Sequence, residues 1–193
     1  MPPLRFAFAP VLMVLAAPAL AQGVPRRPAP VQVMPAPTLR ITGSGEYVVR
    51  RELGPRELPA PKPDSDTIKL VEDPRIVRQT RQIEAQLCRS FGFLFTVDNM
   101  PTGGLDVTVT SIHPAILQPS GRVSTGVTYD MTLTPEPPGL VGFSFDEPWE
   151  LVTGTWTFTV RDGDRVLAEQ SYEVVPSSDA GQVERQDCSA VTS

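Results

Sequence analysis

Apolar residues occupy every second position in short stretches over most of the chain, which is the pattern of β-strands with one buried face. In the clearest stretch, Trp156, Phe158 and Val160 share one side and threonines share the other. Glycine, proline and asparagine residues, which favour turns, separate the stretches. The same spacing predicts further strands over 91–97, 105–110, 127–133 and 141–145.

The strongest hairpin signal lies near the end of the chain. Residues 155–161 and 165–175 are both strand-like, and they flank Asp162-Gly163. A central Asp-Gly pair suits the positive φ angles of a tight turn between antiparallel strands. Asp164 follows this pair, but the stretch does not match a full calcium-binding loop, and a hairpin turn explains it.

The first half of the chain is less regular. Residues 39–51 predict an edge strand with a bend at Gly43–Gly45, and residues 67–72 predict a short strand. Residues 76–88 fit two patterns, a short amphipathic helix or an extended segment with the apolar residues of 83–87 on one face. The pattern alone does not decide between them.

Together these elements predict the fold class. About seven to eight short strands with at most one helix are typical of an all-β, immunoglobulin-like antiparallel β-sandwich. We expect the sandwich over 65–176, after an edge strand and a proline-rich linker over 38–64. The prolines of 22–37 predict a disordered leader, and 177–193 form a polar tail. The cysteines do not suit the inter-sheet disulfide of immunoglobulin domains, so the likeness is one of architecture.

The first 21 residues predict a cleavable export signal. Arg5 is the only charge before the apolar run Phe6–Leu20, and Ala19-Leu20-Ala21 supplies the small residues that a signal peptidase reads. The run is shorter than the ~20 residues that a transmembrane helix needs, and no cysteine follows it that could carry a lipid anchor. We therefore expect cleavage after Ala21 and a periplasmic chain without a membrane span.

The net charge narrows the classes of molecule that the chain could bind. The formal net charge is −5, which disfavours nucleic acid and anionic lipid as partners, because binding either needs concentrated positive charge on the protein.

Cys88 and Cys188 are the only cysteines, and in an exported protein this pair suggests a disulfide that pins the tail. A buried free thiol or two unrelated thiols are the alternatives.

The segments Phe91-Gly92-Phe93, His113-Pro114, 145–151, 154–158 and 167–169 together resemble an uncharacterised family of exported bacterial proteins. The family is a domain of unknown function, and the signature FDxPWELxxGTWTF carries most of the resemblance. It covers about residues 39–175 and implies a β-sandwich, a Gram-negative periplasmic location and an extended conformation around residue 83. It implies no activity.

Two positions depart from the family pattern. Glu84 stands where members tend to have proline, and Cys88 stands where a small residue is expected. The second departure is consistent with a disulfide that is particular to this chain.

A hydrolase would have to use His113, because it is the only histidine. Ser111, Ser124 or Ser144 would then be the nucleophile, but none lies in a Gly-x-Ser-x-Gly elbow. A histidine before proline at a strand end is more typical of a turn. A single histidine also excludes metal sites built from two or three imidazoles.

The acidic corner around Trp149 has two interpretations. As a carbohydrate-binding module, Trp149 would be an exposed platform flanked by the carboxylates of Asp146 and Glu150. As a structural corner, Trp149 covers the end of the sandwich, the carboxylates bind turn amides and Gly154 provides the bend. The residues of the signature corner are Asp146, Glu147, Pro148, Trp149, Glu150, Gly154 and Trp156.

We therefore expect a non-enzymatic periplasmic β-sandwich that binds or supports another envelope component, a protein or a glycan. No cofactor, metal or catalytic residue is predicted. The sugar-binding module and the His113 hydrolase are the alternatives.

Overall fold

The computed structural model describes residues 34–57, 67–178 and 188. The expected signal peptide, the leader up to residue 33, part of the linker and most of the tail lie outside these residues. Within them the chain is β-structure apart from one 3-10 turn. The elements are β1 (Thr38–Val48), β2 (Arg51–Glu57), β3 (Thr67–Glu72), β4 (Arg75–Gln79), β5 (Gln82–Ala85), β6 (Ser90–Asp98), β7 (Leu105–Leu117), β8 (Val123–Leu133), β9 (Gly139–Ser144), η1 (Pro148–Glu150), β10 (Gly154–Asp162) and β11 (Arg165–Pro176).

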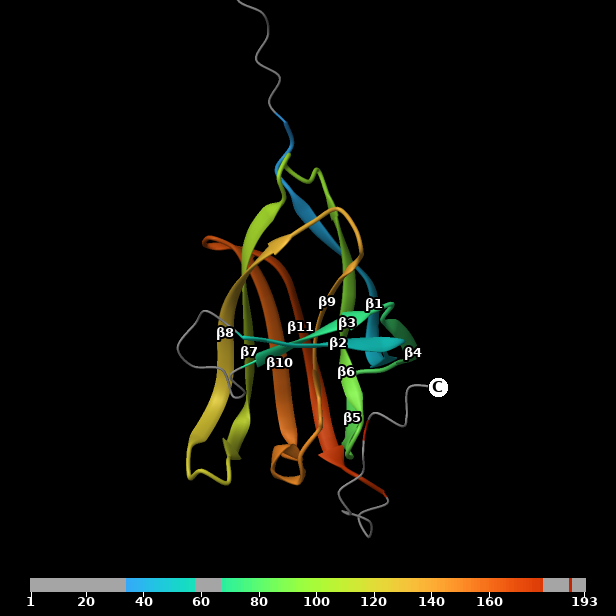
Figure 1. Ribbon diagram of the computed structural model, residues 1–193, viewed down its shortest axis with the longest axis vertical. Coiled ribbons are helices and arrows are strands. Elements are labelled where there is room, and N and C mark those ends of the chain that lie inside the picture. Colours follow the sequence, from blue (N-terminus) through green and yellow to red (C-terminus); the bar gives the residue numbers. More distant parts are fainter. Residues whose placement is uncertain (1–33, 58–66, 179–187, 189–193) are drawn as a thin grey trace, which may run out of the picture. The chain divides into compact units, whose positions relative to one another are not determined.

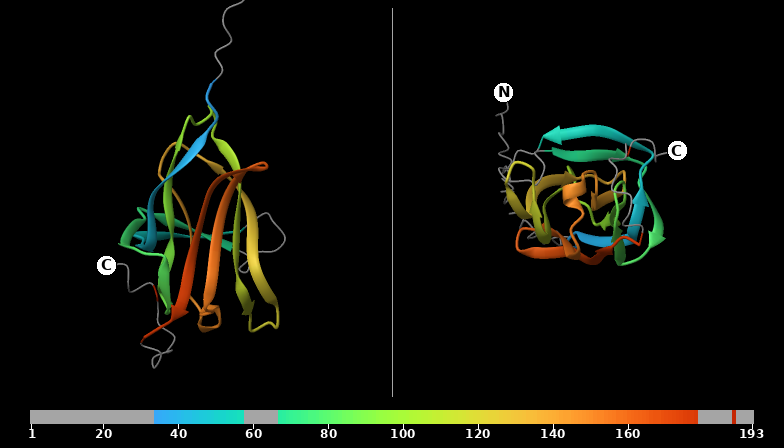
Figure 2. Two further views of the ribbon diagram at one scale, coloured as in Figure 1. Left: turned by 180° about the vertical axis from the view of Figure 1, so that it is seen from behind. Right: turned by 90° about the horizontal axis from the view of Figure 1, so that it is seen from below.

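Two sheets pack face to face as a sandwich, which confirms the predicted fold class (Figures 1 and 2). One sheet has the order β4-β1-β6-β9 and the other has the order β5-β11-β10-β7-β8. Neighbouring strands are antiparallel except β5 and β11, which are parallel. Strands β2 and β3 form a separate two-stranded hairpin.

The core lies between the inner faces of the two sheets. Phe91, Phe93 and Phe95 of β6 face Trp156 and Phe158 of β10, and all five are almost fully buried. Burying a large apolar side chain contributes about 1.5–3 kcal/mol, so this alternation supplies much of the driving force for folding. The β10–β11 hairpin forms around Asp162 and Gly163, as the Asp-Gly pair predicted.

Residues 76–88, which fitted two patterns, are extended up to a turn at 87–88. They form β4 in one sheet and β5 in the other, so the chain crosses between the sheets near Thr80. The Thr80 hydroxyl donates to the Gln82 carbonyl at 3.0 Å and accepts from the Gln82 amide at 3.1 Å, which fixes the crossing. Ile83, Ala85 and Leu87 are buried with a period of two, and this burial excludes a helix.

The prediction that residues 39–51 form an edge strand is wrong. β1 lies between β4 and β6 inside the four-stranded sheet, and it pairs with both. The predicted bend is present as an irregularity between Ile41 and Gly43. Gly45 has φ +140°, and a Cβ there would lie 2.0 Å from the carbonyl oxygen of Arg78. Glycine therefore allows β4 to approach β1 closely.

Tyr172 joins the two sheets through its hydroxyl. From β11 the hydroxyl donates to the carbonyl oxygen of Gly92 on β6 and accepts from the Ser44 hydroxyl on β1 at 2.9 Å. Burial raises the pKa of Tyr172 to about 12, which keeps the hydroxyl protonated as a donor. The contact fixes the position of one sheet relative to the other.

We predict that Tyr172→Phe lowers the free energy of unfolding by about 1–3 kcal/mol, because the buried Gly92 carbonyl loses its donor. Ser44→Ala removes only the second hydrogen bond and should cost less, about 0.5–1.5 kcal/mol. Urea unfolding monitored by tryptophan fluorescence measures both. Equal losses in the two variants would contradict the assignment of the larger effect to Gly92.

Candidate functional site

The acidic corner is a short 3-10 turn, η1, between β9 and β10. The Glu150 carboxylate turns back and accepts hydrogen bonds from the backbone N–H groups of Asp146 at 2.7 Å and Glu147 at 2.9 Å. Glu147 is the N-cap residue of the turn, and Pro148 occupies its first position. The corner thus has a capping-box arrangement, in which an acidic side chain satisfies backbone amides at the start of a helical turn.

Burial gives Glu150 an unusual protonation equilibrium. Glu150 is only 9% exposed, and desolvation raises the pKa of its carboxyl group from 4.5 to about 7. The N–H donors of Glu147 and Asp146 oppose this increase, whereas the negative charges of the same two residues add to it. At neutral pH Glu150 is therefore close to the midpoint of its titration.

Gly154 provides the bend into β10. Its φ is +122°, a backbone conformation that residues with a Cβ rarely adopt, and a Cβ there would lie 2.8 Å from Cγ of Pro114. The close approach of Pro114 to Gly154 fixes the end of β7 against the corner.

The two tryptophans of the corner have different environments. Trp156 is fully buried among aromatic rings, and its Nε1 donates to the Val152 carbonyl at 3.4 Å. Trp149 is half-buried and packs against the edge of the core. Only part of the Trp149 ring therefore reaches solvent, as expected of a side chain that covers the end of the sandwich.

His113 lies inside the sandwich. It is 5% exposed, its ring stacks on Trp156 with centroids 4.5 Å apart, and its Nδ1 lies 2.8 Å from the Pro114 carbonyl oxygen. The hydroxyl of Ser124 donates to the Gly126 carbonyl, and that of Ser144 hydrogen-bonds with Ser90. Ser111 is 8% exposed and lies opposite Phe158 on β10. The His113 imidazole is therefore packed as a core side chain and is not exposed to a substrate.

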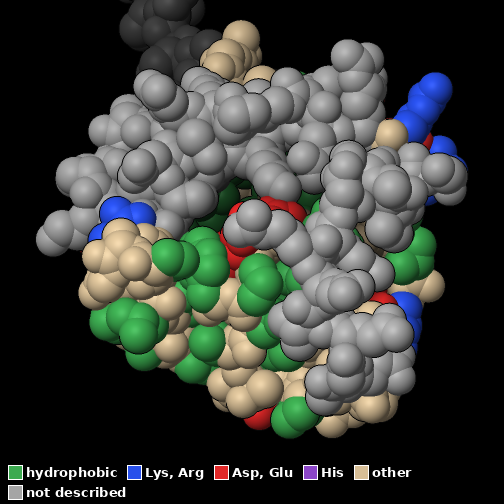
Figure 3. All heavy atoms as spheres, turned by 60° about the horizontal axis from the view of Figure 1, so that its bottom comes forward, with side chains coloured by type: hydrophobic (Ala, Val, Ile, Leu, Met, Phe, Trp, Pro, Cys, Tyr) green, Lys and Arg blue, Asp and Glu red, His purple; other side chains and the backbone are tan. Residues whose placement is uncertain are grey.

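An apolar patch at the same end was not predicted. The strands predicted over 105–110 and 127–133 are longer in the structure, because β7 continues to Leu117 and β8 begins at Val123. These two residues are cross-strand partners and are 62% and 59% exposed. Figure 3 brings this end forward and shows hydrophobic side chains gathered over it, with acidic side chains beside them. We call Leu117, Val123 and Trp149 the apolar end.

The turn between β7 and β8 is held by polar contacts within 118–122. The Gln118 amide donates to the Arg122 carbonyl at 2.8 Å, and Arg122 Nε donates to Oε1 of Gln118 at 2.9 Å. Gln118 is buried, so these contacts satisfy polar groups that solvent does not reach. The result is a fixed tip that holds Leu117 and Val123 in place.

A disulfide joins Cys88, just before β6, to Cys188 beyond β11. The two cysteines are 100 residues apart, and closing a loop of that length stabilises the fold by about 4.7 kcal/mol in the chain-entropy model. Cys88 has a φ of 63°, which places it in a tight turn between β5 and β6. The pair is present as the even cysteine count suggested.

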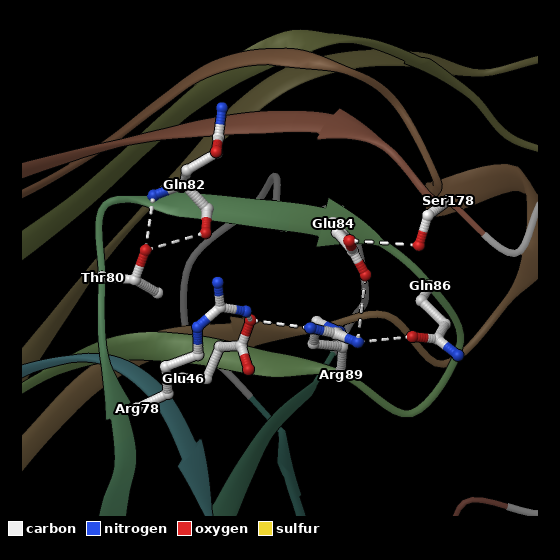
Figure 4. A network of polar contacts seen from close by, with 8 residues as sticks. All are labelled: Glu46, Arg78, Thr80, Gln82, Glu84, Gln86, Arg89 and Ser178. Carbon is white, nitrogen blue, oxygen red and sulfur yellow. Dashed lines mark hydrogen bonds and ion pairs between the residues drawn. The ribbon is translucent and has the colours of Figure 1, made fainter.

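Arg89 is the centre of a polar network beside this disulfide (Figure 4). Its guanidinium forms ion pairs with Glu46 of β1 at 2.7 Å and Glu84 of β5 at 3.4 Å, and it donates to Gln86 at 2.5 Å. Ser178, beyond β11, donates to Glu84 at 3.3 Å. The network connects strands of both sheets and the start of the tail. Its arginine is partly buried and has acidic partners on both sheets, which indicates a structural role.

Among the described residues there is no group of three or more histidine, cysteine, aspartate or glutamate side chains that could hold a metal ion. The same part of the chain has no helix long and apolar enough to cross a membrane.

The raised pKa of Glu150 predicts how stability depends on pH. Between about 4.5 and about 7 the folded chain binds more protons at this position than the unfolded chain, so the free energy of unfolding falls as pH rises. Glu150→Gln keeps an oxygen acceptor for both amides and does not titrate. We expect the melting temperature of this variant to change less across that window than that of the wild type.

The control for this experiment is Glu136→Gln, which changes an exposed carboxylate. The control should keep the pH slope of the wild type. If Glu150→Gln keeps the full slope as well, the titration of Glu150 does not cause it.

Comparisons with known proteins place the chain in a family. No curated protein matches significantly. A crystal structure described as an immunoglobulin-like protein from Pseudomonas aeruginosa is similar, with a TM-score of 0.51, 27% sequence identity, and coverage of 71% of this chain and 96% of that chain. The model of a domain of unknown function, DUF3859, matches residues 54–174. Because this match covers more than half of the sequence, the chain belongs to the DUF3859 family.

Proposed function

We propose that the chain is an exported, non-enzymatic binding module of the bacterial cell envelope, and that it contacts a partner protein through the apolar end. The observation that carries this proposal is the exposure of the cross-strand pair Leu117 and Val123, on a tip fixed by internal polar contacts. Exposed apolar side chains that gather in one patch with a polar rim are typical of protein contact surfaces.

The groups that suggested catalysis or sugar binding have structural roles. The Glu150 carboxylate accepts from two turn amides, and the His113 ring is stacked on Trp156 in the core. A hydrolase needs its base within hydrogen-bonding reach of a nucleophile and of a bound substrate. These positions do not favour the hydrolase alternative.

The same geometry favours a protein partner over a glycan. A sugar platform needs an exposed aromatic face with polar groups directed at the sugar hydroxyls. Here Trp149 is half-buried, the Glu150 carboxylate binds backbone amides, and the exposed apolar pair Leu117 and Val123 is aliphatic. Aliphatic side chains gain most from contact with another apolar protein surface.

Export is supported by two observations. The apolar run Phe6–Leu20 with Ala19-Leu20-Ala21 fits a cleaved signal, and the Cys88–Cys188 disulfide suits an oxidising compartment. We propose the periplasm of a Gram-negative bacterium as that compartment.

We predict that the chain isolated from a periplasmic fraction begins at Gln22. Its intact mass without reductant should be two hydrogens lighter than its mass after reduction, because the single disulfide is closed. Mass spectrometry of both forms measures this. A full-length, reduced chain found in the cytoplasmic fraction would contradict the proposed location.

The proposed contact surface predicts a selective loss of binding in Leu117→Asp, because a charge on an apolar contact must be desolvated. Quantitative affinity isolation from periplasmic extract should recover a partner with the wild type and lose it with this variant. Val166→Asp is the matched control, since Val166 is 45% exposed but lies on the β10–β11 hairpin at the other end (Figure 1).

Equal recovery with Leu117→Asp and the wild type would contradict binding at the apolar end. Binding to an array of envelope glycans that is lost in Trp149→Ala and kept in Leu117→Asp would favour the sugar-binding alternative.

A further inference from the structure

The two sheets have four edge strands, and three of them are protected against pairing with another chain. β4 is five residues long and carries Arg75 and Arg78. β5 is four residues long, and β9 is six residues long and follows Pro137 and Pro138. Short length, charged side chains and neighbouring prolines are the usual means by which proteins prevent contacts between sheet edges.

The fourth edge strand, β8, has none of these protections. It is 11 residues long, contains no proline and carries one charge, that of Asp130. Its pairing with β7 is regular from Leu133 to Gly126, so this part of the edge is not interrupted by a bulge. Within the described residues, no strand pairs with its outer side.

We propose that β8 pairs with β8 of a second copy of this chain, antiparallel about a two-fold axis near Thr128, so that the two five-stranded sheets become continuous. An isologous contact of this kind needs a surface that complements itself. A single strand complements itself when its antiparallel register with a second copy places compatible residues opposite each other.

The side chains of β8 fit this register. With Thr128 opposite itself, Asp130 lies opposite Gly126 and Tyr129 lies opposite Val127. The only carboxylate of the strand is therefore not placed against its own copy, which matters for a chain with a net charge of −5.

The cross-strand pair of Thr110 and Thr128 offers a matched test. The two hydroxyls are hydrogen-bonded to each other at 3.1 Å, on the same face of neighbouring strands. Thr128→Lys and Thr110→Lys each remove this bond and add one positive charge, but only Thr128 is on the edge. At the two-fold axis Thr128→Lys also places two lysines directly opposite each other.

Sedimentation velocity over a concentration series measures the dimer dissociation constant. The sample is the protein as purified from the cells that produce it. We expect the wild type and Thr110→Lys to dimerise with similar constants, and Thr128→Lys to raise the constant about tenfold or more. Circular dichroism and thermal melting confirm that both variants are folded.

A wild type that is monomeric at every concentration would overturn the proposal. So would a dimer that Thr128→Lys leaves intact, or one that both lysine variants weaken equally. The proposal does not depend on the partner contact at the apolar end, because Leu117→Asp should leave the dimer intact.

Discussion

The packing of Phe91 against Trp156 is the contact on which the rest of the structure depends. Their ring centroids are 5.6 Å apart in an edge-to-face arrangement, with one residue in each sheet. Phe143 and Phe145 pack on Trp156 from the β9 side, and His113 stacks on it from β7. Because Trp156 packs against residues of both β9 and β7, it fixes the position of the acidic corner relative to the end of β7.

The alternation of apolar residues predicted the strands and the core, but not which strands are neighbours. β1 appeared to be an edge strand because its pattern is weak and contains glycine. In the structure those glycines permit close pairing on both sides, and Gly45 has no room for a Cβ beside Arg78. A strand's own sequence determines which face is buried, whereas its place in the sheet depends on long-range contacts.

The candidate site shows the same division between local and long-range information. The turn at Gly154 and the acidic corner could be located from residue types alone. The apolar end could not, because Leu117 and Val123 come together only through the β7–β8 register. The chemistry of Glu150 and His113 also depends on burial, which directs one carboxylate to backbone amides and one imidazole to a tryptophan ring.

The position of the disulfide has a consequence for proteolysis. Every strand from β6 to β11 lies between Cys88 and Cys188, so this part of the chain is a covalently closed ring. A protease that cuts one exposed turn within the ring opens it without releasing a fragment. The two new ends remain attached through the sulfur bridge, and a second cut is needed before any of the strands β6 to β11 can leave.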